Sequence, residues 1–357
     1  MGFVIGRADN AVRGRPTGRL GRYRALDGSA GTALSLDLDT PHAMLVVGKR
    51  GYGKSYTLGV IAEELARADG LAPVVIDPMG VFDTLTDAGT QEAVPATVCE
   101  HPTVAPDTLD PKSWCALLGL SPESGPGSLV WQAAQGADSI AAMKAAVRET
   151  DARDSDSRSA HNHLELADSW GVFDTDGLDE ATLSSGAVTV LDVSGLDAEP
   201  MNAVCRGVAD ILYHARLTDN IDRLPWLLVD EAHAFFNGVA GSALRLLLTR
   251  GRAPGVSLVA ATQRPSAIPT VGISQADILV SHRLTATDDL AALEAARPTY
   301  LDGDFADRLP AQPGEVLIVD DATETVHAAR IRTRETPHGG ESPRASELAT
   351  DAQLIEE

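Results

Sequence analysis

Cysteine and lysine are both scarce in this chain of 357 residues. The three cysteines, Cys99, Cys115 and Cys205, stand far apart, and none belongs to a C-x-x-C pair. This argues against a structural zinc site and against a disulfide scaffold, and it suits a reducing cytosol. Hydrophobic residues make up 44% of the chain, so a globular core is expected and wholesale disorder is not.

Long apolar runs are also missing. No stretch of about 18 apolar residues occurs, so the sequence predicts no transmembrane helix and no membrane partner. The N-terminal stretch, MGFVIGRADNAVRGRP, lacks the apolar region of a secretory signal. We therefore expect a cytoplasmic protein.

The charge of the chain is strongly one-sided. Acidic residues number 51 and basic residues 29, which gives a net charge of -22, and the only lysines are Lys49, Lys54, Lys112 and Lys144. An acid excess with little lysine resembles the proteomes of halophilic organisms, in which salt screens self-repulsion. A GC-rich genome would explain the missing lysine but not the acid excess. Neither explanation excludes nucleic acid as a partner, provided that basic residues cluster locally.

The first 24 residues form such a cluster. They contain one acid, Asp9, and six arginines: Arg7, Arg13, Arg15, Arg19, Arg22 and Arg24. A basic arm of this kind could contact phosphates or an acidic neighbouring subunit. A frayed, glycine-spaced terminus explains the composition equally well, and both interpretations stay open.

The pattern after residue 41 is typical of an α/β fold. The apolar run 42–47 reads as a buried strand, residues 54–68 carry apolar positions at helical spacing, and 73–77 reads as a second strand. A strand, loop, helix, strand unit requires a parallel sheet with helical crossovers. Further strands are expected at 187–193, 225–233, 256–263, 277–284 and 315–320, an edge strand at 326–332, and helices at 198–217 and 240–250.

Composition divides the chain into four parts. Residues 1–41 are expected to be a short basic arm, and residues 42–82 and 186–335 the core. Residues 83–185 read as a mainly helical insertion, in which the charged stretch 151–163 is expected to be a solvated loop or linker. The polar residues 336–357 are expected to be a flexible tail.

The stretch GKRGYGKSYT, residues 48–57, satisfies the phosphate-loop pattern G-x-x-x-x-G-K-[ST]. Composition predicts roughly 0.004 accidental matches in a chain of this length. Glycines let the backbone wrap phosphates, Lys54 would reach the β- and γ-phosphates, and Ser55 would ligate Mg²⁺. The predicted nucleotide contacts are Gly48, Gly51, Tyr52, Gly53, Lys54, Ser55 and Tyr56, with ATP and Mg²⁺ as the cofactors.

A phosphate loop needs a metal-holding acid on another strand, and PWLLVDEAH supplies one. Asp230 ends an apolar strand and is predicted to hold Mg²⁺ together with Ser55. Glu231 follows directly and is predicted to be the general base that polarises a water. Without the phosphate loop, the two acids would read as a helix N-cap and a solvated carboxylate.

Two further polar positions are candidates. Gln263 ends the strand VSLVAATQ and could sense the γ-phosphate and hold the attacking water, although it could also simply cap a turn. Arg250 and Arg252 close the preceding helix, where arginine complements the helix dipole without any further role. Either arginine could instead enter a neighbouring subunit's site and stabilise transition-state charge.

With these residues in place, the chain resembles the HerA/FtsK superfamily of ring-forming DNA-pumping ATPases, and within it the HerA-like branch. The resemblance rests on GKRGYGKSYT, VVIDPMGVF, VLDVSGL, WLLVDEAHAFF, TRGRAPGVSLVAATQRPS and PGEVLIV with RTRETPHGG, in order over residues 42–340. It implies a RecA-like core with an extra strand between the two Walker strands, and hexamers with nucleotide sites between subunits. It also raises the trans-acting interpretation of Arg252 and matches Arg283 to a family arginine.

Two departures from the family pattern stand out. HerA proteins usually begin with a β-barrel, which residues 1–41 could hold only in rudimentary form. The segment after Asp77 usually continues with Gly-Glu-aromatic, and here Val81 takes the place of the acid, so any role of that acid is lost.

The resemblance implies an ATP-dependent translocase, possible helicase activity, duplex DNA as the partner and a nuclease as an expected second partner. Genome packaging or plasmid transfer by a virus or mobile element is the alternative. A conjugative coupling ATPase is less expected, because those proteins usually carry membrane helices. A non-catalytic nucleotide-binding scaffold is a further alternative, against which Lys54, Asp230 and Glu231 argue.

Overall fold

The computed structural model describes residues 2–7, 14–25, 28–87, 94–301 and 303–340. In this part of the chain, twelve strands form one sheet in the order β1-β3-β2-β12-β11-β10-β4-β9-β8-β5-β7-β6. The strands are β1 (Phe3–Ile5), β2 (Thr17–Arg24), β3 (Ala30–Asp37), β4 (Ala43–Val47), β5 (Leu71–Asp77), β6 (Ala96–Cys99), β7 (Val188–Asp192), β8 (Leu224–Val229), β9 (Ser257–Thr262), β10 (Ile278–Ser281), β11 (Glu315–Asp320) and β12 (Thr325–Ile331).

Seven neighbouring strands, from β10 to β6 in the sheet order, run parallel to one another. The strands from β10 through β11, β12 and β2 to β3 pair antiparallel, and β1 then pairs parallel with β3. Strand β9 lies between β4, which leads into the phosphate loop, and β8, which ends before Asp230. The expected extra strand between the two Walker strands is therefore confirmed, as is the α/β fold class.

Helices cover both faces of the parallel sheet. They are α1 (Lys54–Leu65), α2 (Pro111–Leu117), α3 (Gly125–Ala134), α4 (Ile140–Glu149), α5 (Asp154–Ser169), α6 (Glu180–Leu183), α7 (Ala198–Leu217), α8 (His233–Phe236), α9 (Gly241–Arg250), α10 (Thr270–Ser274), α11 (Thr287–Ala295) and α12 (Phe305–Arg308). Short 3-10 helices span Asp83–Thr86, Pro106–Thr108 and Pro265–Ala267. Among the helices described, none has both the length and the hydropathy needed to cross a bilayer.

The alternation of side chains along β4 explains the two layers. Met44 and Val46 point to the face that α1 covers, in a cluster with Leu58 and Ile61. Leu45 and Val47 point to the opposite face, which α7 and α9 cover. A strand that is buried on both faces reads as a continuous apolar run, as the sequence of 42–47 does.

The N-terminal segment differs from the expected basic arm. The described part of residues 1–41 contains β1, β2 and β3, which extend the main sheet rather than fraying from it. As a result, β12 is not an edge strand, because it pairs with β11 on one side and β2 on the other. Apolar side chains of this extension, such as Ile5, Leu20 and Leu34, join the core under α1.

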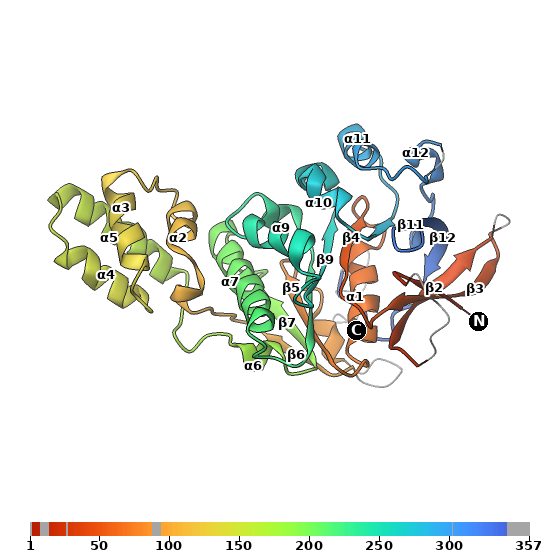
Figure 1. Ribbon diagram of the computed structural model, residues 1–357, viewed down its shortest axis with the longest axis horizontal. Coiled ribbons are helices and arrows are strands. Elements are labelled where there is room, and N and C mark those ends of the chain that lie inside the picture. Colours follow the sequence, from red (N-terminus) through yellow and green to blue (C-terminus); the bar gives the residue numbers. More distant parts are fainter. Residues whose placement is uncertain (1, 8–13, 26–27, 88–93, 302, 341–357) are drawn as a thin grey trace, which may run out of the picture.

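The stretch 151–163 is not a loop, as expected, but lies largely within α5. Its exposed surface is highly polar, yet Ala160, Leu164 and Ala167 recur at helical spacing and are buried. This narrow apolar stripe is sufficient to stabilise the helix, because α5 packs against α3 and α4. The helices α2 to α5 gather at one end of the molecule, far from β2 and β3 (Figure 1). The first strand of the expected helical insertion, β6, pairs with β7 at the end of the sheet.

The expected flexible tail, 336–357, falls mostly outside the described residues. Its first residue, Thr336, is buried, and both its backbone N–H and its hydroxyl donate to Glu63. Residues 332–340 therefore continue the described chain past β12 and pack against α1.

Candidate nucleotide-binding site

The phosphate loop follows β4 and ends at the first turn of α1. Gly51 and Gly53 have φ angles of 78° and 104°, in the left-handed region that favours glycine. Gly53 is the N-cap of α1 and offers no side chain to the first turn, so the amide groups there can face an anion. At Gly48, an added Cβ would come within 2.5 Å of the Cβ of His282, so only glycine fits.

Ser55 and Asp230 meet in the folded chain as predicted for a metal-holding pair. The Ser55 hydroxyl donates to Asp230 Oδ2 over 2.6 Å, although the two residues are 175 positions apart. Asp230 is fully buried. Burial raises its pKa to about 6, although the Ser55 hydrogen bond acts in the opposite direction.

Ser55 and Asp230 offer one hydroxyl and one carboxylate as metal ligands. These are too few for a metal held by side chains alone, but they fit Mg²⁺. Among the described residues, no group of three or more His, Cys, Asp or Glu side chains could hold an ion. A hydroxyl and one carboxylate suit Mg²⁺, which keeps several waters and takes further oxygens from substrate phosphates. Ser55 and Asp230 would hold such an ion.

Lys54 lies buried beside the two acids. Its side chain is largely enclosed. Burial lowers the pKa of the ammonium group, whereas the charges of Glu231 and Asp230 favour its protonated form. A nearly dehydrated cation in this position can interact strongly with phosphate oxygens.

Glu231 has two unusual features. It adopts a φ of 45°, which is rare for a residue with a side chain and costs conformational energy. Its Oε2 is buried without a hydrogen bond, and His233 Nδ1 lies 3.3 Å from it. Burial lowers the pKa of His233, which disfavours the charged form of its ring. A carboxylate held in a strained backbone with an unused oxygen is suited to accepting a proton.

Gln263 follows directly after the end of β9. The carbonyl of Thr262 accepts from the N–H of Gly48 at 3.3 Å, and the carbonyl of Ala261 accepts from Ala232 at 2.8 Å. Gln263 therefore follows a strand end held between the phosphate loop and the Asp230–Glu231 turn. The Thr262 hydroxyl also lies 3.3 Å from His233 Nδ1.

The structure places Arg250 and Arg252 away from this site. Both are exposed, Arg250 as the last residue of α9 and Arg252 just after it, and Arg252 Nη1 lies 3.7 Å from Asp277 Oδ2. Asp277 precedes β10, where its N–H donates to Ala43 at the start of β4. The two arginines thus lie at the amino ends of the parallel strands, opposite the phosphate loop of their own chain.

One histidine near the loop, His282, carries no prediction from the sequence. His282 follows β10 and is buried beneath the glycines, with Nε2 3.0 Å from the Thr57 hydroxyl. Burial, followed by the charge of Lys54, lowers its pKa to about 3, so its ring is neutral. Arg283, the next residue, contributes its carbonyl to the Lys49 N–H at 2.8 Å. The one sequence feature that could have identified His282 as a residue near the loop is its position at the end of a predicted strand.

The loop lines a cleft of about 530 Å³ that also contains residues from distant parts of the chain. Tyr52 lies at this cleft, with Lys49 Nζ 4.4 Å from the centre of its ring. The other lining residues outside the loop and α1 are Met79, Val81, Glu231, Pro313, Gly314, Ile331, His338 and Gly340. Val81, which replaces the acid of the family pattern, therefore presents an apolar side chain to the cleft.

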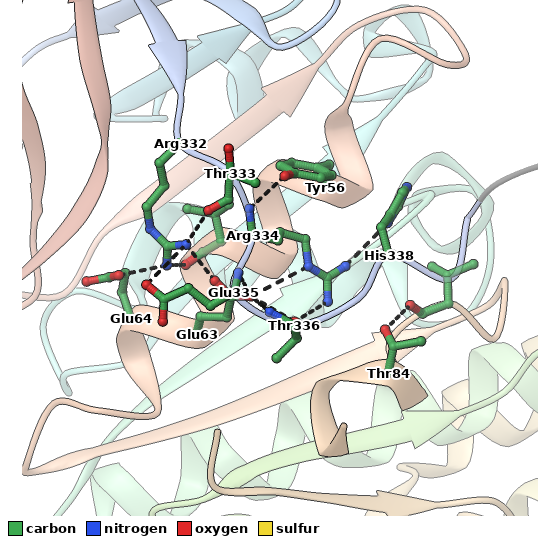
Figure 2. Close-up of polar contacts among 12 residues, drawn as sticks. Tyr56, Glu63, Glu64, Thr84, Arg332, Thr333, Arg334, Glu335, Thr336 and His338 are labelled. Atoms are coloured by element: carbon green, nitrogen blue, oxygen red, sulfur yellow. Dashed lines mark hydrogen bonds and ion pairs between the residues drawn. The ribbon is translucent and has the colours of Figure 1, made fainter. Parts of the chain in front are cut away.

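The segment after β12 forms one wall of the cleft, and Figure 2 shows its contacts with α1. The Arg334 N–H donates to the Tyr56 hydroxyl at 2.6 Å, and the His338 ring packs edge-on against Tyr56 with centroids 5.4 Å apart. Two turns further along α1, the fully buried Glu63 accepts from Arg332 at 2.7 Å and from the backbone of Glu335 and Thr336. Tyr56 thus lies at the cleft, held by partners that the sequence did not reveal.

Solved structures share this fold at low sequence identity. VirB4 of Thermoanaerobacter pseudethanolicus is 17% identical with a TM-score of 0.68, covering 91% of this chain and 98% of that chain. The plasmid coupling protein TrwB, in complex with ADP and Mg²⁺, is 16% identical with a TM-score of 0.54, covering 91% and 97%. The genome packaging NTPase B204 of Sulfolobus turreted icosahedral virus 2 is a weaker match that does not by itself establish a shared fold: it is 12% identical with a TM-score of 0.43, covering 81% and 97%.

Sequence comparison gives the family. No curated protein matches the chain significantly. The family described as "Helicase HerA, central domain" matches residues 20–210, a span that includes the phosphate loop, β5 and the helices α2 to α6. Because this match covers more than half of the chain, the protein belongs to the family of the HerA central domain.

Proposed function

We propose that the protein is a motor that hydrolyses ATP and moves duplex DNA. The observation that carries the proposal is the 2.6 Å contact between Ser55 and the buried Asp230, with Glu231 directly beside it. This arrangement supports hydrolysis more than passive nucleotide binding, because a scaffold does not need a strained carboxylate with an unused oxygen at the phosphate end.

Each residue of the site has a role in the proposed reaction. A bound Mg²⁺ would neutralise charge on the β- and γ-phosphates. Lys54 draws the phosphates into the cleft, and the amide groups at the start of α1 orient them. Glu231 takes the proton of the attacking water, and Gln263 orients that water.

The nucleotide site is proposed to lie between subunits of a ring. Arg252 and Arg250 are exposed at the edge of the sheet opposite their own phosphate loop. Residues so placed cannot serve the site of their own chain, but in a head-to-tail ring they can face the next one. We propose Arg252 as the residue that stabilises transition-state charge in the neighbour, within a hexamer.

Turnover of ATP, measured with and without duplex DNA at high KCl concentration, tests the proposal. DNA should raise the rate of the wild-type protein. Glu231→Gln should lower turnover about 100-fold or more while leaving nucleotide binding intact, and Lys54→Ala should weaken binding itself. Glu123→Gln, on an exposed turn of the helical region, is the matched control and should change neither. An unaltered rate in Glu231→Gln would exclude the hydrolytic site, and a rate indifferent to DNA would exclude the motor.

Mixed rings test the trans-acting arginine. Arg252→Ala and Lys54→Ala subunits are each expected to be inactive as uniform assemblies. In a mixture, an intact phosphate loop can meet an intact arginine, so part of the activity should return. Native mass spectrometry gives the number of subunits. Full turnover in uniform Arg252→Ala assemblies would exclude the role.

A further inference from the structure

A second cleft, of about 270 Å³, lies on the sheet extension between β2, β12 and the β2–β3 turn. It is far from the helices α2 to α5, at the end of the molecule that contains β2 and β3 (Figure 1). We call it the arginine cleft, because its walls carry Arg19, Arg22, Arg24 and Arg330. Arg332 also lines it, but the guanidinium of that residue is bound to Glu63 and Glu64 at 2.7 Å each.

An irregularity in β2 brings these arginines together. Regular alternation would place Arg19 and Arg22 on opposite faces of the sheet. The pairing of β2 with β3 shifts register between Arg19 and Gly21, so Leu20 and Gly21 are both buried while Arg19 and Arg22 are both exposed. Bulges that redirect side chains are enriched beside functional sites.

Gly21 is required for this arrangement. An added Cβ would lie 2.1 Å from the carbonyl oxygen of Arg330, so β2 and β12 approach each other too closely for any side chain there. The neighbouring pair is Arg22 with Arg330, which stand directly opposite each other on antiparallel strands. Like charges in directly opposite positions destabilise a sheet, so the pair has a cost in the isolated protein.

Acidic residues do not balance the cluster. Among the described residues that line the cleft, Glu315 is the one acid. It lies 2.7 Å from Arg24 Nη1 and 3.7 Å from Arg330 Nη2, so one carboxylate serves two of the four guanidinium groups. This positive surface is unusual in a chain with 51 acidic and 29 basic residues, and it favours an anionic ligand.

The lining of the cleft points to phosphates rather than to a protein surface. Around the arginines lie Gly28, Ser29, Ala30 and Thr333, and the larger apolar groups are limited to Tyr23 and Ile331. Protein interfaces usually bury an apolar centre, whereas backbone phosphates are bound by guanidinium groups and small polar residues. Arginine also matches phosphate oxygens with two parallel hydrogen bonds.

The arginine cleft and the nucleotide cleft share a wall. Ile331 lines both clefts, and its N–H donates to Gly314, another residue of the nucleotide cleft, at 2.9 Å. From Ile331 the chain continues through Arg332 and Arg334 to His338, which lines the nucleotide cleft. A ligand on Arg330 would therefore touch the strand that leads directly to the ATP site.

We infer that the arginine cleft binds the phosphate backbone of DNA, next to the nucleotide cleft and without reading base sequence. The inference rests on the proposed DNA motor and adds the surface that the duplex contacts. Each neutralised phosphate contributes about 0.9 to the slope of log affinity against log salt concentration. The slope therefore gives the number of phosphates that the arginines neutralise.

The test is the binding of a fluorescent duplex by the full chain, measured by anisotropy over a series of KCl concentrations. Arg22→Gln/Arg330→Gln should bind about 10-fold or more weakly at low salt, with the salt slope reduced by about 1.8. Arg22→Lys/Arg330→Lys should keep most of the slope, because charge is retained. The matched control Arg223→Gln/Arg297→Gln removes two exposed arginines outside the cleft and should keep the wild-type slope.

Turnover without DNA should be unchanged in Arg22→Gln/Arg330→Gln, and its melting temperature should be equal to or above that of the wild type, since a like-charge pair is removed. If the wild type binds no duplex, the proposed function fails together with the inference. If the wild type binds but the variant keeps its full slope, the inference alone is overturned. Loss of the oligomer in the variant, with the slope unchanged, would also overturn it and assign the arginines to a second copy of the chain.

Discussion

Asp230 is held in an environment that disfavours its charge. Burial raises its pKa to about 6 against an ordinary value of 3.8, and the Ser55 hydroxyl offsets only part of this effect. Since the folded-state pKa is raised, this carboxyl stabilises the fold in its protonated form at low pH, and that contribution is lost as pH rises through about 6. At neutral pH the site without metal therefore carries a cost that a bound cation would relieve.

Asp230→Asn should expose this cost directly. At pH 8 the variant should be more stable than the nucleotide-free wild type by up to about 3 kcal/mol, since one pKa unit corresponds to about 1.4 kcal/mol. At pH 4 the difference should disappear, because the wild-type carboxyl is then protonated. Urea unfolding at both pH values checks this. ATP turnover should fall at least 100-fold in the same variant. A variant that is less stable than the wild type at pH 8 would show that the carboxylate is not under strain.

Gly59 lies in the middle of α1, where glycine normally weakens a helix. An added Cβ would approach Arg334 Cζ to 2.7 Å. The Arg334 guanidinium is almost completely buried, and it donates to the Thr336 hydroxyl at 2.8 Å. The absence of a side chain at Gly59 is what lets this charged group lie flat on the helix.

Gly59→Ala should destabilise the protein by about 1 to 2 kcal/mol, although helix propensity alone predicts a gain of about 1 kcal/mol. The reason is that the buried guanidinium must move away from its partners. Chemical denaturation gives the free energy of unfolding. Gly136→Ala, where an added Cβ meets nothing within 4 Å, is the control and should be neutral. A stabilised Gly59→Ala protein would mean that Arg334 has room to shift.

At the scale of elements, helix α1 connects the phosphate loop to the end of the described chain. Its N-terminus faces the nucleotide cleft, and a residue of its last turn, Glu63, holds the segment after β12. Arg332 and Glu63 are both buried, so their ion pair is shielded from water and salt. This contact keeps His338 at the cleft, since only a few residues separate it from Thr336.

Glu63→Ala should detach this segment. Removal of one partner from a buried ion pair costs about 3 to 5 kcal/mol, because Arg332 would be left buried without its main counter-charge. Hydrogen exchange should speed up in residues 332–340, and nucleotide affinity should fall with the loss of one wall of the cleft.

Glu335→Ala is the comparison for that experiment. It removes a partly exposed carboxylate that pairs with Arg67, so its cost should be below about 1 kcal/mol. Equal effects of the two substitutions would contradict the role assigned to Glu63.

Which elements could be predicted depended on the strength of the local pattern. The buried parallel strands and α7 were readable, because each is a continuous apolar run or a long amphipathic helix. Helix α5 was missed because three buried residues, Ala160, Leu164 and Ala167, are its whole apolar stripe. Strand β2 was missed because glycine and arginine make up five of its eight residues, and one of its two pairing partners, β12, lies far away in the sequence.

At the scale of the whole molecule, the net charge of -22 has a direct physical consequence. Self-repulsion of the carboxylates weakens the compact state, and dissolved salt screens it. Buried contacts such as Glu63 with Arg332 are largely protected from the same screening. Salt should therefore strengthen the fold overall while weakening the proposed contact of the arginine cleft with DNA.

The melting temperature should rise by several degrees between 0.1 and 2 M KCl at pH 7.5. Near pH 5, close to the sequence pI of 4.7, the increase should be much smaller, because the net charge is nearly zero. Differential scanning calorimetry at both pH values gives the comparison. A melting temperature that is insensitive to KCl at pH 7.5 would remove the link between the acidic surface and salt.

The sequence by itself determined the chemistry at the ends of the strands. The phosphate loop, Asp230 and Glu231 are each encoded within a few consecutive residues, and local propensity and burial pattern suffice to place them on strand, loop or helix. The tertiary structure alone decided which of these ends meet. Ser55 contacts Asp230 across 175 positions, and Glu63 holds Thr336 across 273. Strand order and register bring such distant groups together, because they depend on packing of the whole sheet rather than on any local stretch.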